Sequence, residues 1–145
     1  MVFGIFKAFR DRSLTKSNTS QKGRIRVLKS RNIGNNEVIN IQGYDTYIDD
    51  VSGLEVSKYL DQTECVLVPN LSYYPRACFM PLGCIADGSV AILTTINGEK
   101  VTKNDLAYYA SDEFCKFYSI ARNRGTRSLN IDNNSVFFYG KLKQV

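Results

Sequence analysis

The sequence predicts an α+β fold, in which a single domain is built on a mixed or antiparallel twisted sheet with a few helices. Two observations lead to this prediction. The middle third of the chain holds short apolar runs separated by turn residues, a pattern typical of strands in a sheet. The last third holds apolar residues at the spacing of an amphipathic helix, namely Phe114, Phe117, Tyr118 and Ala121. The length of 145 residues and the hydrophobic content of 43% fit one domain with its own core.

The first third of the chain predicts two strands, a loop and a hairpin. Residues 2–9 are rich in Phe and Ile and favour a strand, whereas residues 11–22 are polar and form a loop with no apolar face to bury. In residues 24–28, arginines alternate with β-branched residues, which predicts a strand with its basic side in solvent. A turn at 35–36 then makes 37–41 the expected return strand of a hairpin.

The remaining elements follow from apolar runs and capping residues. Residues 52–60 predict a short helix with acidic residues near its start. Thr102 and Asp105 resemble a capping box, and Ser111 or Asp112 is the expected cap of a second helix. Residues 135–139 form an aromatic strand near the end of the chain. The predicted strands of the middle third are 65–68, 77–80, 84–86 and 90–96.

The amino-acid composition excludes several classes of functional site. Lys and Arg number 19 against 14 Asp and Glu, and the resulting net charge of +5 favours an anionic partner. The chain has no histidine, which excludes histidine triads, imidazole acid–base catalysis and histidine-ligated zinc. The four cysteines lack the paired spacing of a zinc site and read as reduced thiols, with Cys65, Cys78 and Cys84 buried. We therefore expect no metal site and no catalytic residue.

The sequence also bears on location. No apolar run approaches the roughly 18 residues of a membrane-spanning helix, and residues 1–12 carry charges where a signal peptide is apolar. We therefore expect a cytoplasmic protein without a membrane partner.

One loop concentrates side chains that can read DNA bases. Residues 69–76 are bracketed by prolines and contain Asn70, Tyr73, Tyr74 and Arg76. Asn can form two hydrogen bonds with adenine and Arg with guanine, while Tyr can stack on a base or reach a phosphate. The alternative is structural, with the tyrosines capping the core and Arg76 in a surface ion pair.

Two basic groups complete the candidate site. One lies at the end of the last helix and in the loop after it, where close arginines repel one another unless an anion compensates them. The other follows the strand at 24–28. Helix-dipole stabilisation and an ordinary solvated sheet face are the alternatives. The expected phosphate contacts are Arg24, Lys29, Arg31, Arg122 and Arg124, and Thr126, Arg127 and Ser128 join the base-reading residues.

Four strings of the chain carry a family resemblance. They are 26–33 (RVLKSRNI), 66–76 (VLVPNLSYYPR), 86–93 (ADGSVAIL) and 120–130 (IARNRGTRSLN). Their order resembles the C-terminal target-recognition domain of adenine-specific (N6) DNA methyltransferases of type II restriction-modification systems. The looser layout is also similar to the target-recognition domains of type I specificity subunits. The resemblance extends over most of the chain.

The resemblance implies that residues 1–145 form one target-recognition domain that reads a site in double-stranded DNA. The catalytic domain of these enzymes, with its S-adenosylmethionine site and Asn/Asp-Pro-Pro-Tyr/Phe motif, has no counterpart in this sequence. We therefore expect no cofactor in this chain, no methylation by the chain alone, and a methyltransferase catalytic domain or subunit as partner. Two alternatives stay open. One is a protein that binds RNA or single strands without sequence preference, and the other is a small enzyme that uses Cys or Tyr.

Overall fold

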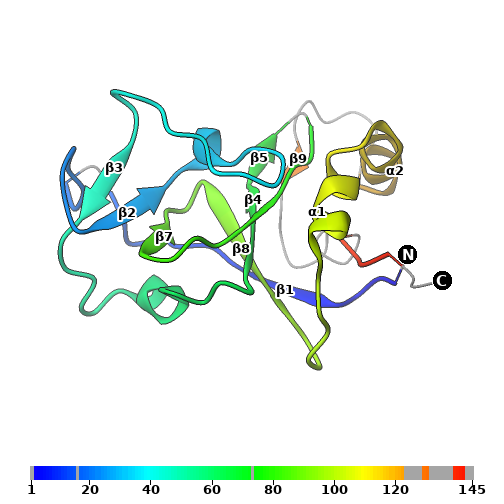
Figure 1. Ribbon diagram of the computed structural model, residues 1–145, viewed down its shortest axis with the longest axis horizontal. Helices are drawn as coiled ribbons and strands as arrows, with labels where there is room; N and C mark the ends of the chain where they lie inside the picture. The colour runs from blue at the N-terminus through cyan, green and yellow to red at the C-terminus, as the bar shows by residue number, and fades with distance from the viewer. Residues whose placement is uncertain (1, 16, 73, 123–128, 131–138, 143–145) are drawn as a thin grey trace.

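The computed structural model of the chain describes residues 2–15, 17–72, 74–122, 129–130 and 139–142 (Figure 1). It has the predicted α+β character, with helices and short strands in mixed and antiparallel sheets. The elements are β1 (Phe6–Phe9), β2 (Ile25–Leu28), the 3-10 helix η1 (Ser30–Asn32), β3 (Thr46–Ile48), the 3-10 helix η2 (Glu55–Tyr59), β4 (Val66–Pro69), β5 (Leu71–Ser72), β6 (Cys78–Phe79), β7 (Cys84–Ala86), β8 (Val90–Thr95), α1 (Lys103–Tyr109), α2 (Asp112–Arg122) and β9 (Leu129–Asn130).

An antiparallel sheet in the order β1-β8-β4-β6 forms the middle layer of the molecule. Successive side chains of a strand point to opposite faces, and in β4 both sets are apolar. Val66 and Val68 join the core on one face, whereas Leu67 joins the core on the other. Because the strand is covered on both sides, its sequence is a continuous apolar run rather than an alternating one.

The two α-helices cover one face of this sheet (Figure 1). The predicted capping box is confirmed, because Thr102 Oγ1 accepts the Asp105 N–H at 3.4 Å and Asp105 Oδ2 accepts the Thr102 N–H at 2.8 Å. Ser111 caps α2, where its Oγ accepts the Phe114 N–H at 3.1 Å. Among the described residues, no helix has the length and apolar character needed to cross a membrane. The buried aromatic side chains on this side are Tyr109, Phe114, Tyr118 and Tyr139.

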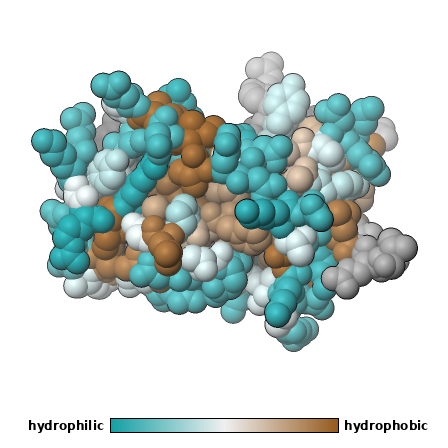
Figure 2. Space-filling model, in the orientation of Figure 1, coloured by the Kyte–Doolittle hydropathy of each residue, from teal (hydrophilic) through white to brown (hydrophobic). Residues whose placement is uncertain are grey.

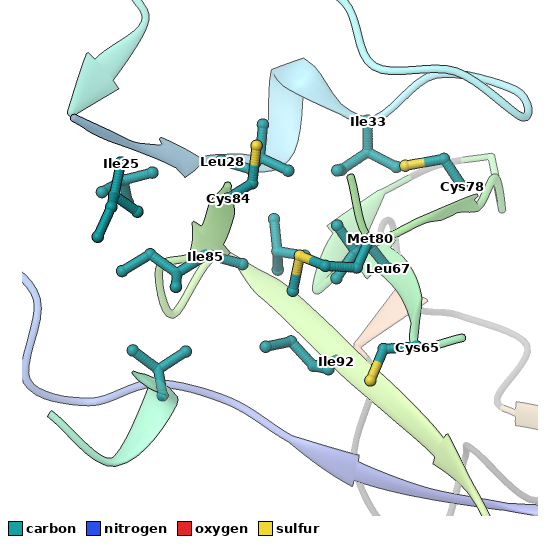
Figure 3. Packing of buried hydrophobic residues seen from close by; sticks show 14 of the residues in the cluster. Ile25, Leu28, Ile33, Cys65, Leu67, Cys78, Met80, Cys84, Ile85 and Ile92 are labelled. Atoms are coloured by element: carbon teal, nitrogen blue, oxygen red, sulfur yellow. The ribbon is translucent and has the colours of Figure 1, made fainter. Parts of the chain in front are cut away.

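A second sheet, in the order β3-β2-β7, lies on the other side of the middle layer. β2 is parallel to β7 and antiparallel to β3. Figure 3 shows Leu28 and Ile85 of this sheet facing Leu67 and Ile92 of the middle layer. The three layers are therefore helices, a central sheet and a smaller mixed sheet, with one core on each side of the centre.

The predicted hairpin between the strand at 24–28 and residues 37–41 is wrong. The antiparallel partner of β2 is β3, and 37–41 bonds to the segment just before it. The Gly34 N–H donates to the Glu37 carbonyl at 2.8 Å, and the Ile39 N–H donates to the Asn32 carbonyl at 2.7 Å. The chain changes direction at η1, so the backbone of 37–41 pairs with 32–34 rather than with β2.

The predicted short helix at 52–60 is confirmed as the 3-10 helix η2. The polar segment at 11–22 holds a buried polar side chain, because Asp11 is only 5% exposed. Its carboxylate accepts the N–H groups of Ser13 at 3.0 Å and Leu14 at 2.7 Å, so a local turn replaces the solvation that burial removes. The strand expected at 135–139 lies outside the described residues except for Tyr139.

Candidate nucleic-acid interface

The turn between β7 and β8, residues 87–89, joins the segments that carry the candidate residues. Ser89 uses its N–H and hydroxyl to hold Asp87 Oδ1, at 3.0 and 2.5 Å. The hydroxyl oxygen of Ser89 also accepts the Ser30 N–H at 3.0 Å, and its carbonyl accepts the Asn70 N–H at 2.8 Å. One residue therefore bonds to both η1 and the start of the loop at 69–76, although these lie far apart in sequence.

Arg76 makes a second connection between the same two segments. Its Nε donates to the Ile33 carbonyl at 2.5 Å and its Nη2 to the Ser30 carbonyl at 3.2 Å. The guanidinium is half-buried, and burial lowers its pKa, while the nearby Tyr139 acts in the opposite direction. Arg76 thus holds the 69–76 loop against η1.

The other described residues of the loop differ in exposure. Asn70 follows β4 and is only 8% exposed, whereas Tyr74 is 73% exposed. The alternative in which Tyr74 caps the core is therefore wrong. Tyr73 lies outside the described residues.

Lys29 and Arg31, two of the predicted phosphate contacts, lie beside this loop and share one aromatic ring. Lys29 Nζ lies 3.9 Å from the centre of the Tyr44 ring, and Arg31 Cζ lies 4.9 Å from it. The Tyr44 hydroxyl also accepts the Arg31 N–H at 3.3 Å. We call these three residues the basic cluster. The ring faces attract both cations and hold them close together, an arrangement that attracts an anion.

Sequence reasoning missed Tyr44. It stands between Gly43 and Asp45 in a loop with no spacing that relates it to Lys29 or Arg31. A Tyr next to Gly and Asp is an ordinary turn composition. Only the folding of this loop over η1 shows that the ring meets the two cations.

Arg24 lies apart from the basic cluster. It precedes β2 whereas Lys29 follows it, so about 16 Å of extended strand separate the two. Its N–H donates to Asp49 Oδ1 at 2.9 Å, and its side chain is exposed. The predicted row of phosphate contacts is thus split along the length of β2. The expectation that the basic side of this strand lies in solvent is wrong for Arg26, whose guanidinium pairs with Asp45 at 3.1 Å and whose side chain is only 17% exposed.

The second predicted basic group is only partly described. Arg122 is the last residue of α2, while Arg124, Thr126, Arg127 and Ser128 lie outside the described residues. The chain is described again at β9, which pairs antiparallel with β5. Since β5 is part of the 69–76 loop, the segment after α2 returns directly beside that loop (Figure 1).

A pocket of about 610 Å³ opens next to the basic cluster. Its walls combine Lys29 and Tyr44 of the cluster with hydroxyl-bearing residues of the loop before β2. Figure 2 shows hydrophilic side chains over most of the face seen in Figure 1, with hydrophobic residues in patches between them. The pocket-lining residues include Lys29, Tyr44, Asp87, Thr15, Thr19 and Ser20.

The thiols in the core between the central sheet and the β3-β2-β7 sheet do not contribute reactive groups. Cys65, Cys78 and Cys84 are buried, as predicted, and burial raises the pKa of Cys65 to about 11 and that of Cys78 to about 12. These groups are therefore protonated at neutral pH.

Neither protein-family models nor the sequences of curated proteins give a match to this chain.

Proposed function

We propose that this chain is a sequence-specific recognition module for double-stranded DNA, which reads the target site for an adenine methyltransferase of a restriction-modification system. The face that carries the basic cluster and the 69–76 loop contacts the DNA. The catalytic domain and its S-adenosylmethionine belong to a partner domain or subunit. The family resemblance of the sequence supports the methyltransferase part of this proposal, and the geometry of the face supports the DNA-binding part.

The observation that carries the proposal is the pair of contacts made by Ser30. It donates its N–H to Ser89 and accepts a hydrogen bond from Arg76. These bonds bring two kinds of side chain to one surface. Lys29 and Arg31 supply charge for phosphates, which positions a protein on DNA, and the 69–76 loop supplies side chains suited to base edges.

The described residues of this face have different expected roles. Lys29 and Arg31 are the expected phosphate contacts, whereas the exposed Tyr74 is the described loop residue best placed to touch a base. Arg76 already donates to two carbonyls, which makes it the support of the loop as well as a candidate base reader.

A second candidate function is the binding of RNA or single-stranded nucleic acid without sequence preference. The 73% exposure of Tyr74 favours it, because an exposed aromatic side chain can stack on any unpaired base.

Selection from a random duplex DNA library on the purified chain tests the proposal, at about 50 and about 150 mM salt. Enrichment of a short asymmetric sequence is the expected result. Competition with single-stranded DNA and RNA of the same composition separates the second candidate, since tighter binding of single strands would favour stacking over groove reading. A chain that retains no nucleic acid at either salt concentration would refute both functions.

A further inference from the structure

A buried polar network lies directly beneath the basic cluster. Asp45 Oδ2 accepts the Ile41 N–H at 3.0 Å and pairs with Arg26 Nη2 at 3.1 Å. Its Oδ1 accepts Asn32 Nδ2 at 2.7 Å. The side chains of Arg26 and Asp45 are 17% and 14% exposed, and Asn32 is fully buried. One carboxylate thus accepts hydrogen bonds from Asn32 of η1 and from Ile41 of its own loop, and forms an ion pair with Arg26 of β2.

The network ties together the segments that carry the basic cluster. The Oδ1 of Asn32 accepts the Lys29 N–H at 2.9 Å, and its Nδ2 also donates to the Ile39 carbonyl at 2.9 Å. Arg26 completes the connection with bonds to Asn40 and to the Ile39 carbonyl. η1, β2 and the loop that ends at Asp45 are therefore fixed relative to one another.

Tyr44 precedes Asp45 directly, so the position of its ring depends on this network. The ring brings the head groups of Lys29 and Arg31 to within about 10 Å of each other, roughly one Debye length at 0.1 M salt. Two cations at this separation repel each other when no anion is present, and only a fixed support keeps them together.

We infer that Asp45 is a positioning residue for phosphate binding, and that it holds Tyr44, Lys29 and Arg31 as one clamp for the phosphates of a nucleic acid. This inference rests on the proposed function and deepens it. Asp45 touches no phosphate. Its negative charge is compensated by Arg26 and by the N–H groups of Asn32 and Ile41, so the clamp above it keeps its positive field.

The direction in which Asp45→Asn changes DNA affinity distinguishes a positioning role from a purely electrostatic one. Asp45→Asn removes a negative charge, so a purely electrostatic role predicts tighter binding of DNA. A positioning role predicts weaker binding, by about eightfold at 0.1 M salt if one phosphate contact with a counterion-release slope of about 0.9 is lost. Asp50→Asn is the matched control, because Asp50 is exposed and accepts hydrogen bonds from the N–H and hydroxyl of its near neighbour Ser52.

Tyr44 offers a test outside the buried network, in case Asp45→Asn fails to fold. Tyr44→Phe keeps the ring that both cations contact, whereas Tyr44→Leu removes it. We expect Tyr44→Leu to lose the same phosphate contact. Tyr44→Phe should weaken binding less than Tyr44→Leu, because it loses only the hydroxyl that accepts the Arg31 N–H. Thermal unfolding of each variant confirms that the fold is retained.

The experiment measures binding of a mixed-sequence DNA duplex and, separately, of pyrophosphate, followed by the NMR shifts of the Lys29 and Arg31 amides. Weaker binding of both ligands by Asp45→Asn and Tyr44→Leu, with Asp50→Asn unchanged or tighter, supports the inference. Equal or tighter binding by folded Asp45→Asn and Tyr44→Leu overturns it. Pyrophosphate binding that depends on Asp45, without any binding of duplex DNA, would reject the proposed function and keep the clamp. No binding of either ligand would reject both.

Discussion

The turn at 87–89 has a glycine that the surrounding structure requires, and its replacement gives the sharpest stability prediction. A Cβ atom at Gly88 would lie closer than 3.0 Å to the carbonyl oxygen of Asp11. That oxygen belongs to backbone, and the Asp11 carboxylate accepts N–H groups from Ser13 and Leu14 that stiffen the segment. The segment therefore has little freedom to move away from an added methyl group.

We expect Gly88→Ala to lower the free energy of unfolding by about 2 kcal/mol, within the usual range for overpacking a tight site. For a domain of this length, that loss lowers the melting temperature by about 4–8 °C. Urea unfolding followed by circular dichroism measures the change. The loss falls at the turn that also joins η1 to the 69–76 loop, so DNA binding by the folded variant should weaken too.

Gly98→Ala is a useful comparison, because its cost has a different origin. A Cβ at Gly98 meets nothing within 4 Å, but the backbone has a φ of 71°, which costs about 1 kcal/mol for a residue with a side chain. Unfolding of Gly88→Ala at the same urea concentration as the unaltered chain would show that the Asp11 segment yields freely, and would refute the reasoning.

Four further predictions concern charge, capping and thiols. Lys29→Ala should reduce the salt dependence of DNA binding by about one phosphate contact, whereas Lys58→Ala, a lysine that also lies over aromatic rings but on η2, should leave the slope unchanged. Asp105→Ala should cost about 2 kcal/mol in urea unfolding, because the buried carboxylate accepts the N–H groups of Thr102 at 2.8 Å and Leu142 at 2.6 Å. Iodoacetamide at pH 8 should label Cys115 well before Cys78, whose thiol is buried. Burial raises the pKa of Cys78 from 9.0 to about 12, so the unfolded chain releases this proton first. The contribution of Cys78 to stability should therefore fall from pH 9 to pH 12, a loss that Cys78→Ala should remove from the pH profile.

Local features of the fold were predictable because they depend on neighbouring residues. The Thr102–Asp105 capping box and the amphipathic spacing of α2 are set within a single turn or two of helix. The apolar run of β4 similarly marks a strand that is buried on both faces. These signals are short-range, and tertiary contacts in this protein reinforce them.

The partner of β2 was not predictable in the same way. A turn at 35–36 and a strand-like pattern at 37–41 are the usual local signs of a hairpin. β2 pairs instead with β3 and β7, and contacts between residues distant in sequence stabilise this pairing. They include the shared core around Leu28 and Ile85. Local pattern carries no information about such long-range pairing.

The sequence by itself determined which chemistry this protein offers: a basic, histidine-free chain with an amide, phenols and a guanidinium in a loop bracketed by prolines. The tertiary structure decided which of these groups meet. Ser89 and Arg76 bring the 69–76 loop to η1, and the Asp45 network sets Tyr44 under Lys29 and Arg31, while Arg24 stays at the far end of β2. The physical reason is that hydrogen bonds and cation–π contacts act over a few ångströms in space. Only the packing of separate segments decides which of those contacts form.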